Sequence, residues 1–168
     1  YAKFAKLPIV PLVVTPGDEG IQDSTPIIER IEAEHPTPSI HPPDPVSGFV
    51  SALLEEFGDE WGNKWMFHFR WARDVDQIAS AGRIARGMMP GASDEQHAAM
   101  SAQIRERMVS RVFFVGSNEK TAKQIESSLR EALGILDAHL ATRPYLFGAR
   151  PAFADLGLFA QLYEAWTD

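Results

Sequence analysis

A short stretch near the beginning of the chain groups residues that can hold a carboxylate. Gln22, Asp23 and Ser24 come just before Pro26, and a proline suits the first turn of a helix because its missing N–H is not needed there. Free N–H groups and the positive dipole end of a helix attract carboxylates, and a serine hydroxyl adds a donor. The pattern predicts either a carboxylate-binding helix start or a helix that Asp23 or Ser24 merely caps.

A proline inside an apolar run is the second feature that could serve a binding site. Residues 8–14 are apolar, rich in β-branched side chains and bounded by turn residues, which predicts a short buried strand. Pro11 lies within this run, although proline lacks a ladder donor and is confined to edges, bulges or special positions. The residue is either an ordinary trans proline of an edge strand or part of a cis Val10–Pro11 bond, and we predict the cis form.

The elements around these residues form two regions joined by a stiff segment. After the first strand, a turn at residues 16–20 and a very short second strand lead to a helix that starts near Ser24 and ends near His35. Five prolines fall between residues 36 and 45, which predicts a linker. From residue 46 onward the pattern is helical. We therefore divide the chain into residues 1–36, a linker at 37–45 and an all-helical region at 46–168.

The helical region opens with an apolar stripe and an aromatic run. The stripe recurs at helical spacing, which predicts a face buried against other helices, and consists of Val46, Phe49, Val50, Leu53, Leu54 and Phe57. Trp61, Trp65 and Phe69 extend it, and core packing is the simplest role for the two tryptophans. His68 is either a structural histidine or, as the less favoured reading, a catalytic base. The spacing of the histidines does not match a metal site, so no metal is expected.

The composition excludes several classes of site. Of 168 residues, 45% are hydrophobic and 23% charged, which predicts a packed core. The formal net charge of −7 opposes broad contact with phosphate backbones or anionic lipid, so neither a nucleic acid nor a membrane is expected as a partner. The sequence contains no cysteine, which rules out disulfides, thiolate metal sites and a cysteine nucleophile within it.

Taken in order, these motifs resemble the glutathione transferase family. The features that carry the resemblance are the apolar run with Pro11, the stretch Gln22-Asp23-Ser24, the stretch Pro144-Tyr145-Leu146-Phe147-Gly148, and Asp155 at the start of the last helix. The resemblance implies an α+β, mostly helical fold. A partial thioredoxin-like N-terminal domain, made of a β-hairpin plus a helix, would be followed by an all-α glutathione transferase C-terminal domain.

The last helix departs from the family pattern at its first turn. The family normally has Ser or Thr three residues before the aspartate, which forms a local capping box, whereas this chain has Ala152 before Asp155. Half of the reciprocal cap is lost. We therefore expect Asp155 to act through the helix dipole or a single backbone bond.

The resemblance also implies where ligands would bind. Glutathione would bind as a substrate to Val10, Pro11, Gln22, Asp23 and Ser24. The backbone of Val10, before a cis proline, would meet the peptide part of glutathione, and residues 22–24 would grip its γ-glutamyl end. A possible pocket for the apolar co-substrate would be lined by Trp65, His68 and Phe69.

The implied activity is attack of a glutathione thiolate on an electrophilic small molecule, catalysed by a cytoplasmic homodimer. Family members activate the sulfur with a Tyr, Ser or Cys that lies well upstream of the proline strand. Tyr1 is too close to Pro11 for that role, so we expect the activating group outside this sequence, which looks incomplete at both ends. The alternative is a non-enzymatic glutathione transferase-like module that serves in binding or assembly.

Overall fold

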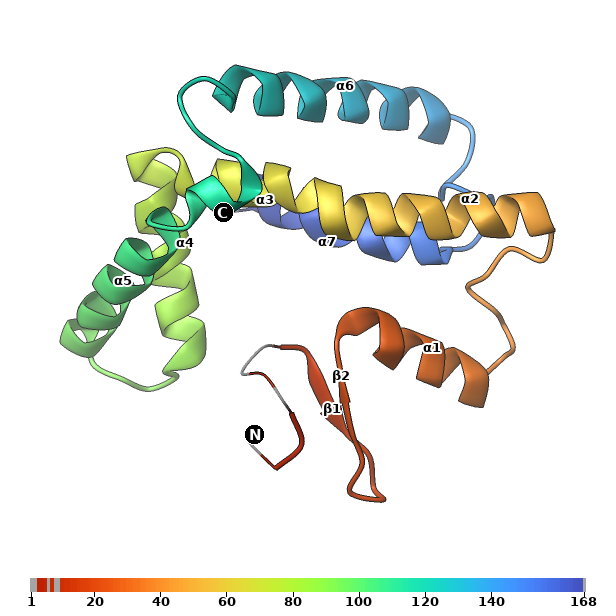
Figure 1. Cartoon of the computed structure of the whole chain (residues 1–168), viewed down its shortest axis with the longest axis horizontal. Helices are drawn as coiled ribbons and strands as arrows, with labels where there is room; N and C mark the ends of the chain where they lie inside the picture. The colour runs from red at the N-terminus through yellow and green to blue at the C-terminus, as the bar shows by residue number, and fades with distance from the viewer. Residues whose placement is uncertain (1–2, 6, 8–9, 168) are drawn as a thin grey trace. The chain divides into compact units, whose positions relative to one another are not determined.

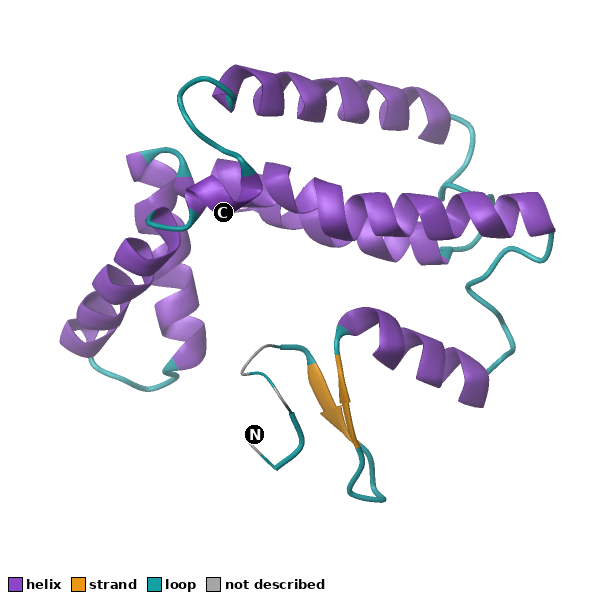
Figure 2. Ribbon diagram, in the orientation of Figure 1, coloured by secondary structure: helices purple, strands orange, loops and turns teal. Residues whose placement is uncertain are grey.

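The computed structural model describes residues 3–5, 7 and 10–167, and the chain divides into two compact units, residues 1–40 and 41–168. The first unit contains a β-hairpin and one helix, and the second is built from helices (Figure 2). The predicted linker at residues 37–45 spans the point where the two units join.

The first unit is small. Strand β1 (Leu12–Val14) pairs antiparallel with β2 (Gly20–Gln22), with Leu12 opposite Gln22, and helix α1 (Ser24–Glu34) follows. Pro8 and Ile9 of the predicted strand lie outside the described residues. The described strand is shorter than predicted and is not buried, because Val13 and Val14 are both exposed in a sheet of two strands. The buried apolar side chain of α1 is Ile27.

The second unit contains the helices that the sequence predicts, with one change of type. The elements are α2 (Pro45–Glu56), η1 (Phe57–Gly62), α3 (Asn63–Trp71), α4 (Asp74–Met88), α5 (Asp94–Val109), η2 (Val112–Val115), α6 (Ala122–Leu140) and α7 (Phe153–Thr167) (Figure 1). Element η1 is a π-helix that contains Gly58 and Gly62 and joins α2 to α3. Helix α5 begins at a complete capping box formed by Ser93 and Gln96.

Helix α7 runs beside α2, η1 and α3, and the contact depends on small residues (Figure 1). A Cβ atom built on Gly58 would lie 2.7 Å from the carbonyl carbon of Gly157, and one on Gly157 would lie 2.9 Å from the carbonyl oxygen of Glu55. Real side chains do not fit at such distances, so the two backbones meet at these glycines. The closest contacts with α7 are therefore made by small residues, Ser51 of α2 and Gly58 of η1, and Leu54 of α2 packs beside them.

Most of the apolar stripe of α2 faces away from this contact, and Leu54 is the member that packs against the cluster of Ala154 and Leu158. Val46 is 71% exposed and Phe49 is 69% exposed, and Leu53 is also exposed, so the expectation of a buried stripe was wrong for these residues. The core-packing role predicted for Trp61 was also wrong, because its side chain is 61% exposed. The core forms two clusters instead: Trp65, Ile125 and Leu129 in one, and Leu146, Ala154 and Leu158 in the other.

The first turn of α7 is buried, and its backbone N–H groups find partners in two places. Asp155 accepts from the N–H of Ala152 at 2.8 Å and from the N–H of Leu146 at 3.0 Å. The expectation of a single backbone bond was therefore wrong. The Oγ of Ser51 on α2, which is fully buried, accepts from the N–H of Ala154 at 3.2 Å. Ser51 thus supplies, from another helix, the hydroxyl that Ala152 lacks.

Leu129 should anchor the first of the two core clusters. Its side chain is buried against Trp65 and Ile125, so Leu129→Ala leaves a cavity and should lower the free energy of unfolding by about 2–5 kcal/mol. Leu133 is one turn further along α6 and is exposed, so Leu133→Ala should cost less than about 1 kcal/mol. Urea unfolding measures both. Equal costs at the two positions would show that the buried face of α6 has been misassigned.

Ser51 should be coupled energetically to position 152. Ser51→Ala leaves a buried N–H of α7 without its acceptor and should lower the free energy of unfolding by about 0.5–2 kcal/mol. Ala152→Ser in the same chain should restore a local cap and recover part of that loss. A double-mutant cycle measured by urea unfolding tests the coupling. Strictly additive effects would mean that the two hydroxyls do not serve the same helix end.

Candidate functional site

The predicted glutathione-binding residues that the structure describes lie together in the first unit. The N–H of Asp23 donates to the carbonyl oxygen of Pro11 at 3.1 Å, which places the start of α1 beside the proline. Gln22 is the last residue of β2 and pairs with Leu12, the residue after Pro11. The side-chain amide of Gln22 donates to the carbonyl oxygen of Leu7 at 2.8 Å. The hairpin therefore brings two sequence-distant motifs to one place.

The Val10–Pro11 peptide bond is cis, as predicted. A second cis bond joins Thr37 to Pro38, which the sequence did not predict. The side chain of Val10 is largely exposed, so its main chain lies at the surface of the unit.

Asp23 precedes α1 in an unusual backbone conformation. Its φ of 86° and ψ of 144° are rare for a residue with a side chain, and such conformations concentrate at binding and catalytic sites. Its carboxylate does not cap α1. The hydroxyl of Ser24 lies 3.5 Å from an Asp23 carboxylate oxygen, which is the outer limit of a hydrogen bond. The first turn of α1 holds no acidic residue, so it presents a hydroxyl and a positive dipole end beside one exposed carboxylate.

The three residues of the predicted co-substrate pocket occupy different surroundings. Trp65 is buried, donates from Nε1 to the Oγ of Ser128 at 2.8 Å, and lines a cavity of about 360 Å³. His68 is buried, lies with Nδ1 2.7 Å from the Oγ of Ser117, and lines a separate cavity of about 310 Å³. Phe69 packs against the core cluster of Trp65. The co-substrate pocket therefore stays a prediction from the resemblance.

The ring of His68 also faces a charged group. Its Nε2 lies 3.6 Å from Oε1 of Glu126, which is too long for a hydrogen bond. Glu126 is held at 2.7 Å by Arg73 and at 3.5 Å by Arg130. The hydrogen bond from Arg73 is the main cause that lowers the pKa of Glu126 below its usual value. These contacts tie α3 to α6 and to the turn at Ser117, which supports the structural reading of His68.

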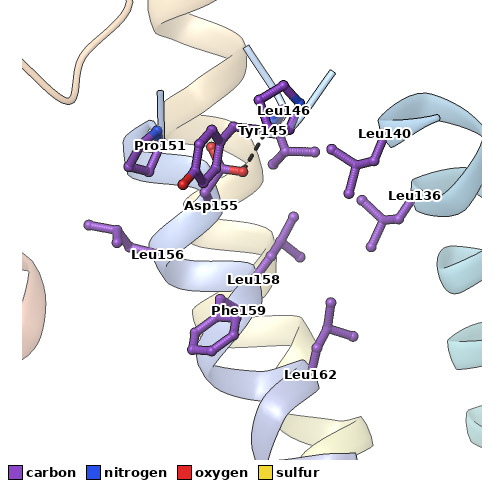
Figure 3. A pocket seen from close by; sticks show the side chains of 11 residues that line it. Leu136, Leu140, Tyr145, Leu146, Pro151, Asp155, Leu156, Leu158, Phe159 and Leu162 are labelled. Carbon is purple, nitrogen blue, oxygen red and sulfur yellow. Dashed lines mark hydrogen bonds between the residues drawn. The ribbon is translucent and has the colours of Figure 1, made fainter. Parts of the chain in front are cut away.

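A further cavity, of about 330 Å³, lies between α6, the loop after it and α7 (Figure 3). Its walls are almost entirely apolar and include Leu136 and Leu140 from α6 and Leu158 and Phe159 from α7. Asp155 also lines it, but both of its carboxylate oxygens already accept backbone N–H groups. Sequence reasoning missed this cavity because its walls come from two helices separated by a loop. The apolar character of α7 on every side was the available signal.

Two negative findings hold for the described residues. Within the ranges 3–5, 7 and 10–167, no group of His, Asp and Glu side chains is arranged to hold a metal ion. Over the same described part of the chain, no helix has the length and apolar character needed to cross a membrane.

Comparison with known proteins identifies the C-terminal part of the helical unit. Residues 98–168 match the family model for the glutathione S-transferase C-terminal domain. This part of the chain is therefore glutathione S-transferase-like, and the predicted fold class, a small antiparallel hairpin with one helix followed by a helical C-terminal domain, is confirmed. Comparisons with curated proteins and with solved structures found no match.

The pairing of Glu126 should make stability depend on acid pH. Because its pKa is lower in the folded protein, the pairing stabilises fully above the ordinary glutamate pKa of 4.5, and this stabilisation is lost as pH falls through the lowered value. Glu126→Gln should lower the free energy of unfolding at pH 7, and the deficit should shrink at a pH well below 4.5. Glu131→Gln, on the exposed side of α6, serves as the control in urea unfolding at both pH values. A deficit of the same size at both pH values would contradict the ionic role of Glu126.

Proposed function

We propose that the protein binds glutathione through its first unit and transfers it to an electrophilic small molecule. The observation that carries the proposal is the family match of residues 98–168, read together with the helix start at Asp23 and Ser24. The match alone supports a glutathione S-transferase-like protein, and the substrate and reaction are our inference from it.

The γ-glutamyl end of glutathione fits the chemistry at the start of α1. This end carries one carboxylate and one ammonium group. In the proposal the carboxylate meets the Ser24 hydroxyl and the first N–H groups of α1, where the helix dipole favours negative charge. Gln22 and the exposed carboxylate of Asp23 would meet the ammonium group. The main chain of Val10, before Pro11, would hydrogen-bond the peptide part of the ligand.

The proposed reaction is nucleophilic attack by the glutathione sulfur. The thiolate is the reactive form, so a neighbouring hydrogen-bond donor must lower the thiol pKa. The sulfur then forms a bond to the electrophilic carbon, and the leaving group departs with the bonding electrons. The residues at positions 10, 11 and 22–24 position glutathione in this scheme, and we assign no residue of this chain to sulfur activation.

The family resemblance is also the basis for proposing a cytoplasmic homodimer. The exposed apolar residues of α2 support a protein partner, because exposed apolar patches commonly mark interaction sites. Val46, Phe49 and Leu53 are the members of this patch with the largest exposed fractions on α2. Sedimentation of the chain and of a Phe49→Glu variant would test whether this face joins two copies.

Glutathione binding should depend on Ser24. Ser24→Ala removes one charge-assisted hydrogen bond, worth roughly 1.5–3 kcal/mol, so the affinity for glutathione should fall by about ten- to a hundred-fold. Calorimetric titration of the chain with glutathione measures the change. Ser127→Ala, at an exposed position of α6, is the matched control and should bind like the unaltered chain. Thermal unfolding of both variants checks that the fold is kept.

Three outcomes separate the alternatives. Loss of affinity in Ser24→Ala together with conjugation of an aryl halide above the uncatalysed rate supports the transferase. The same loss without catalysed conjugation, in a protein that also carries the sulfur-activating residue, favours the non-enzymatic binding module. Equal affinities for the two serine variants, or no glutathione binding by the unaltered chain, would overturn the proposed site.

A further inference from the structure

The cavity that Trp65 lines has an aromatic wall and one cation, Lys64, among its lining residues. We call it the aromatic cavity, and it measures about 360 Å³. Its wall comes from η1 and α3 on one side and from η2, the following turn and α6 on the other. The lining residues are Phe57, Trp61, Lys64, Trp65, Val115, Gly116, Thr121, Gln124, Ile125 and Ser128. A cavity of this size accepts a small organic ligand.

The hydroxyl groups of the aromatic cavity are already used by the protein. Ser128 Oγ accepts from Trp65 Nε1 at 2.8 Å and donates to the carbonyl oxygen of Ile125 at 2.8 Å. Thr121 Oγ1 donates to the carbonyl oxygen of Gly116 at 2.6 Å and accepts from the N–H of Asn118 at 3.0 Å. These groups hold the turn and the helix together and offer little to a ligand. The polar group of a ligand must therefore be met elsewhere.

Lys64 is the cation of this cavity, and it lacks an acidic partner. Its Nζ lies 4.5 Å from the centroid of the Trp61 ring, and within the described residues it forms no ion pair. Glu60 is one turn earlier but does not pair with it. Arg70, Arg73 and Arg105 of the same unit each pair with a carboxylate. The ammonium group of Lys64, which lies beside the aromatic wall without such a pair, can meet the anionic group of a ligand.

The aromatic wall is built by the π-helix. Element η1 runs from Phe57 to Gly62, and π-helical turns are rare and frequent at functional sites. Phe57 and Trp61 both line the cavity, and the ring of Phe57 packs edge-on against Trp65 with centroids 5.6 Å apart. Trp61 is 61% exposed although it is one of the largest apolar side chains in the sequence. Lys64 Nζ lies over this ring, and the exposed surface that Lys64 leaves uncovered is the part that a stacking partner would contact.

We propose that the aromatic cavity binds a small aromatic carboxylate, with its ring against Trp61 and Phe57 and its anionic group at Lys64. The flat, apolar wall selects an aromatic body, and Lys64, the cation among the lining residues, selects a single negative charge. The site lies wholly within the helical unit and needs no glutathione, so it stands or falls independently of the proposed transferase function.

The test uses 1-naphthoate as the charged probe and 1-naphthamide as its uncharged counterpart. Equilibrium dialysis or calorimetry of the whole chain should show that 1-naphthoate binds more tightly than 1-naphthamide. Lys64→Gln should weaken 1-naphthoate roughly five- to tenfold and leave 1-naphthamide nearly unchanged, because only the charged contact is lost. Lys64→Arg keeps the charge and should stay within about twofold of the unaltered chain. Trp61→Leu should weaken both probes.

Two controls locate the probe. Lys123→Gln removes an exposed charge on α6 outside the cavity and should have no effect. Phe159→Ala alters the apolar cavity beside α7 and should also have no effect. The proposal is overturned if 1-naphthoate does not bind, if Lys64→Gln and Lys123→Gln bind it equally, or if Phe159→Ala weakens binding more than Trp61→Leu does.

Discussion

The stability of the helical unit depends on burying the first turn of α7 while supplying hydrogen-bond acceptors to its backbone N–H groups. Ala152, Phe153 and Ala154 are all buried, and a buried helix start without acceptors would be strongly unfavourable. Asp155 accepts the N–H of Ala152 at the helix start and also the N–H of Leu146, which fixes the preceding loop. Ser51 of α2 accepts the N–H of Ala154. The same contacts therefore satisfy the helix end, place the loop and set the position of α2 against α7.

This arrangement explains why the residues that α2 buries are not its most hydrophobic ones. Ser51 approaches Ala154, Gly58 approaches Gly157 and Gly62 approaches Gln161, so the contacts advance in the same direction along both helices. Close backbone approach requires small residues along this line. Most large apolar side chains of α2, such as Val46, Phe49 and Leu53, are left exposed. Where the helix widens into η1, Phe57 and Trp61 form the wall of the aromatic cavity.

The sequence predicted what depends on local chemistry. Residue types a few positions apart determine the hairpin, the helix starts at Ser24 and Ser93, and the helical pattern after residue 45. The cis bond at Val10–Pro11 follows from residue types in the same way. Prediction from the sequence failed where the two residues in contact lie far apart along the chain. Ser51 and Ala154 are 103 residues apart, so no local pattern could reveal that one hydroxyl replaces the missing cap. Hydrophobic periodicity likewise identified the helix at residues 46–57 but chose the wrong buried face, because close glycine contacts outweighed apolar area.

The two proposed sites meet an anionic group in different ways. An acidic chain repels an anionic ligand at long range, so each site needs a local positive field. At Ser24 that field comes from the backbone N–H groups and dipole of α1, whose first turn holds no acidic residue, and the carboxylate of Asp23 just before the helix opposes it. At Lys64 it comes from a full charge that the protein has not neutralised. Because the first site lies in residues 1–40 and the second in residues 41–168, removing either source of charge should leave the other site intact.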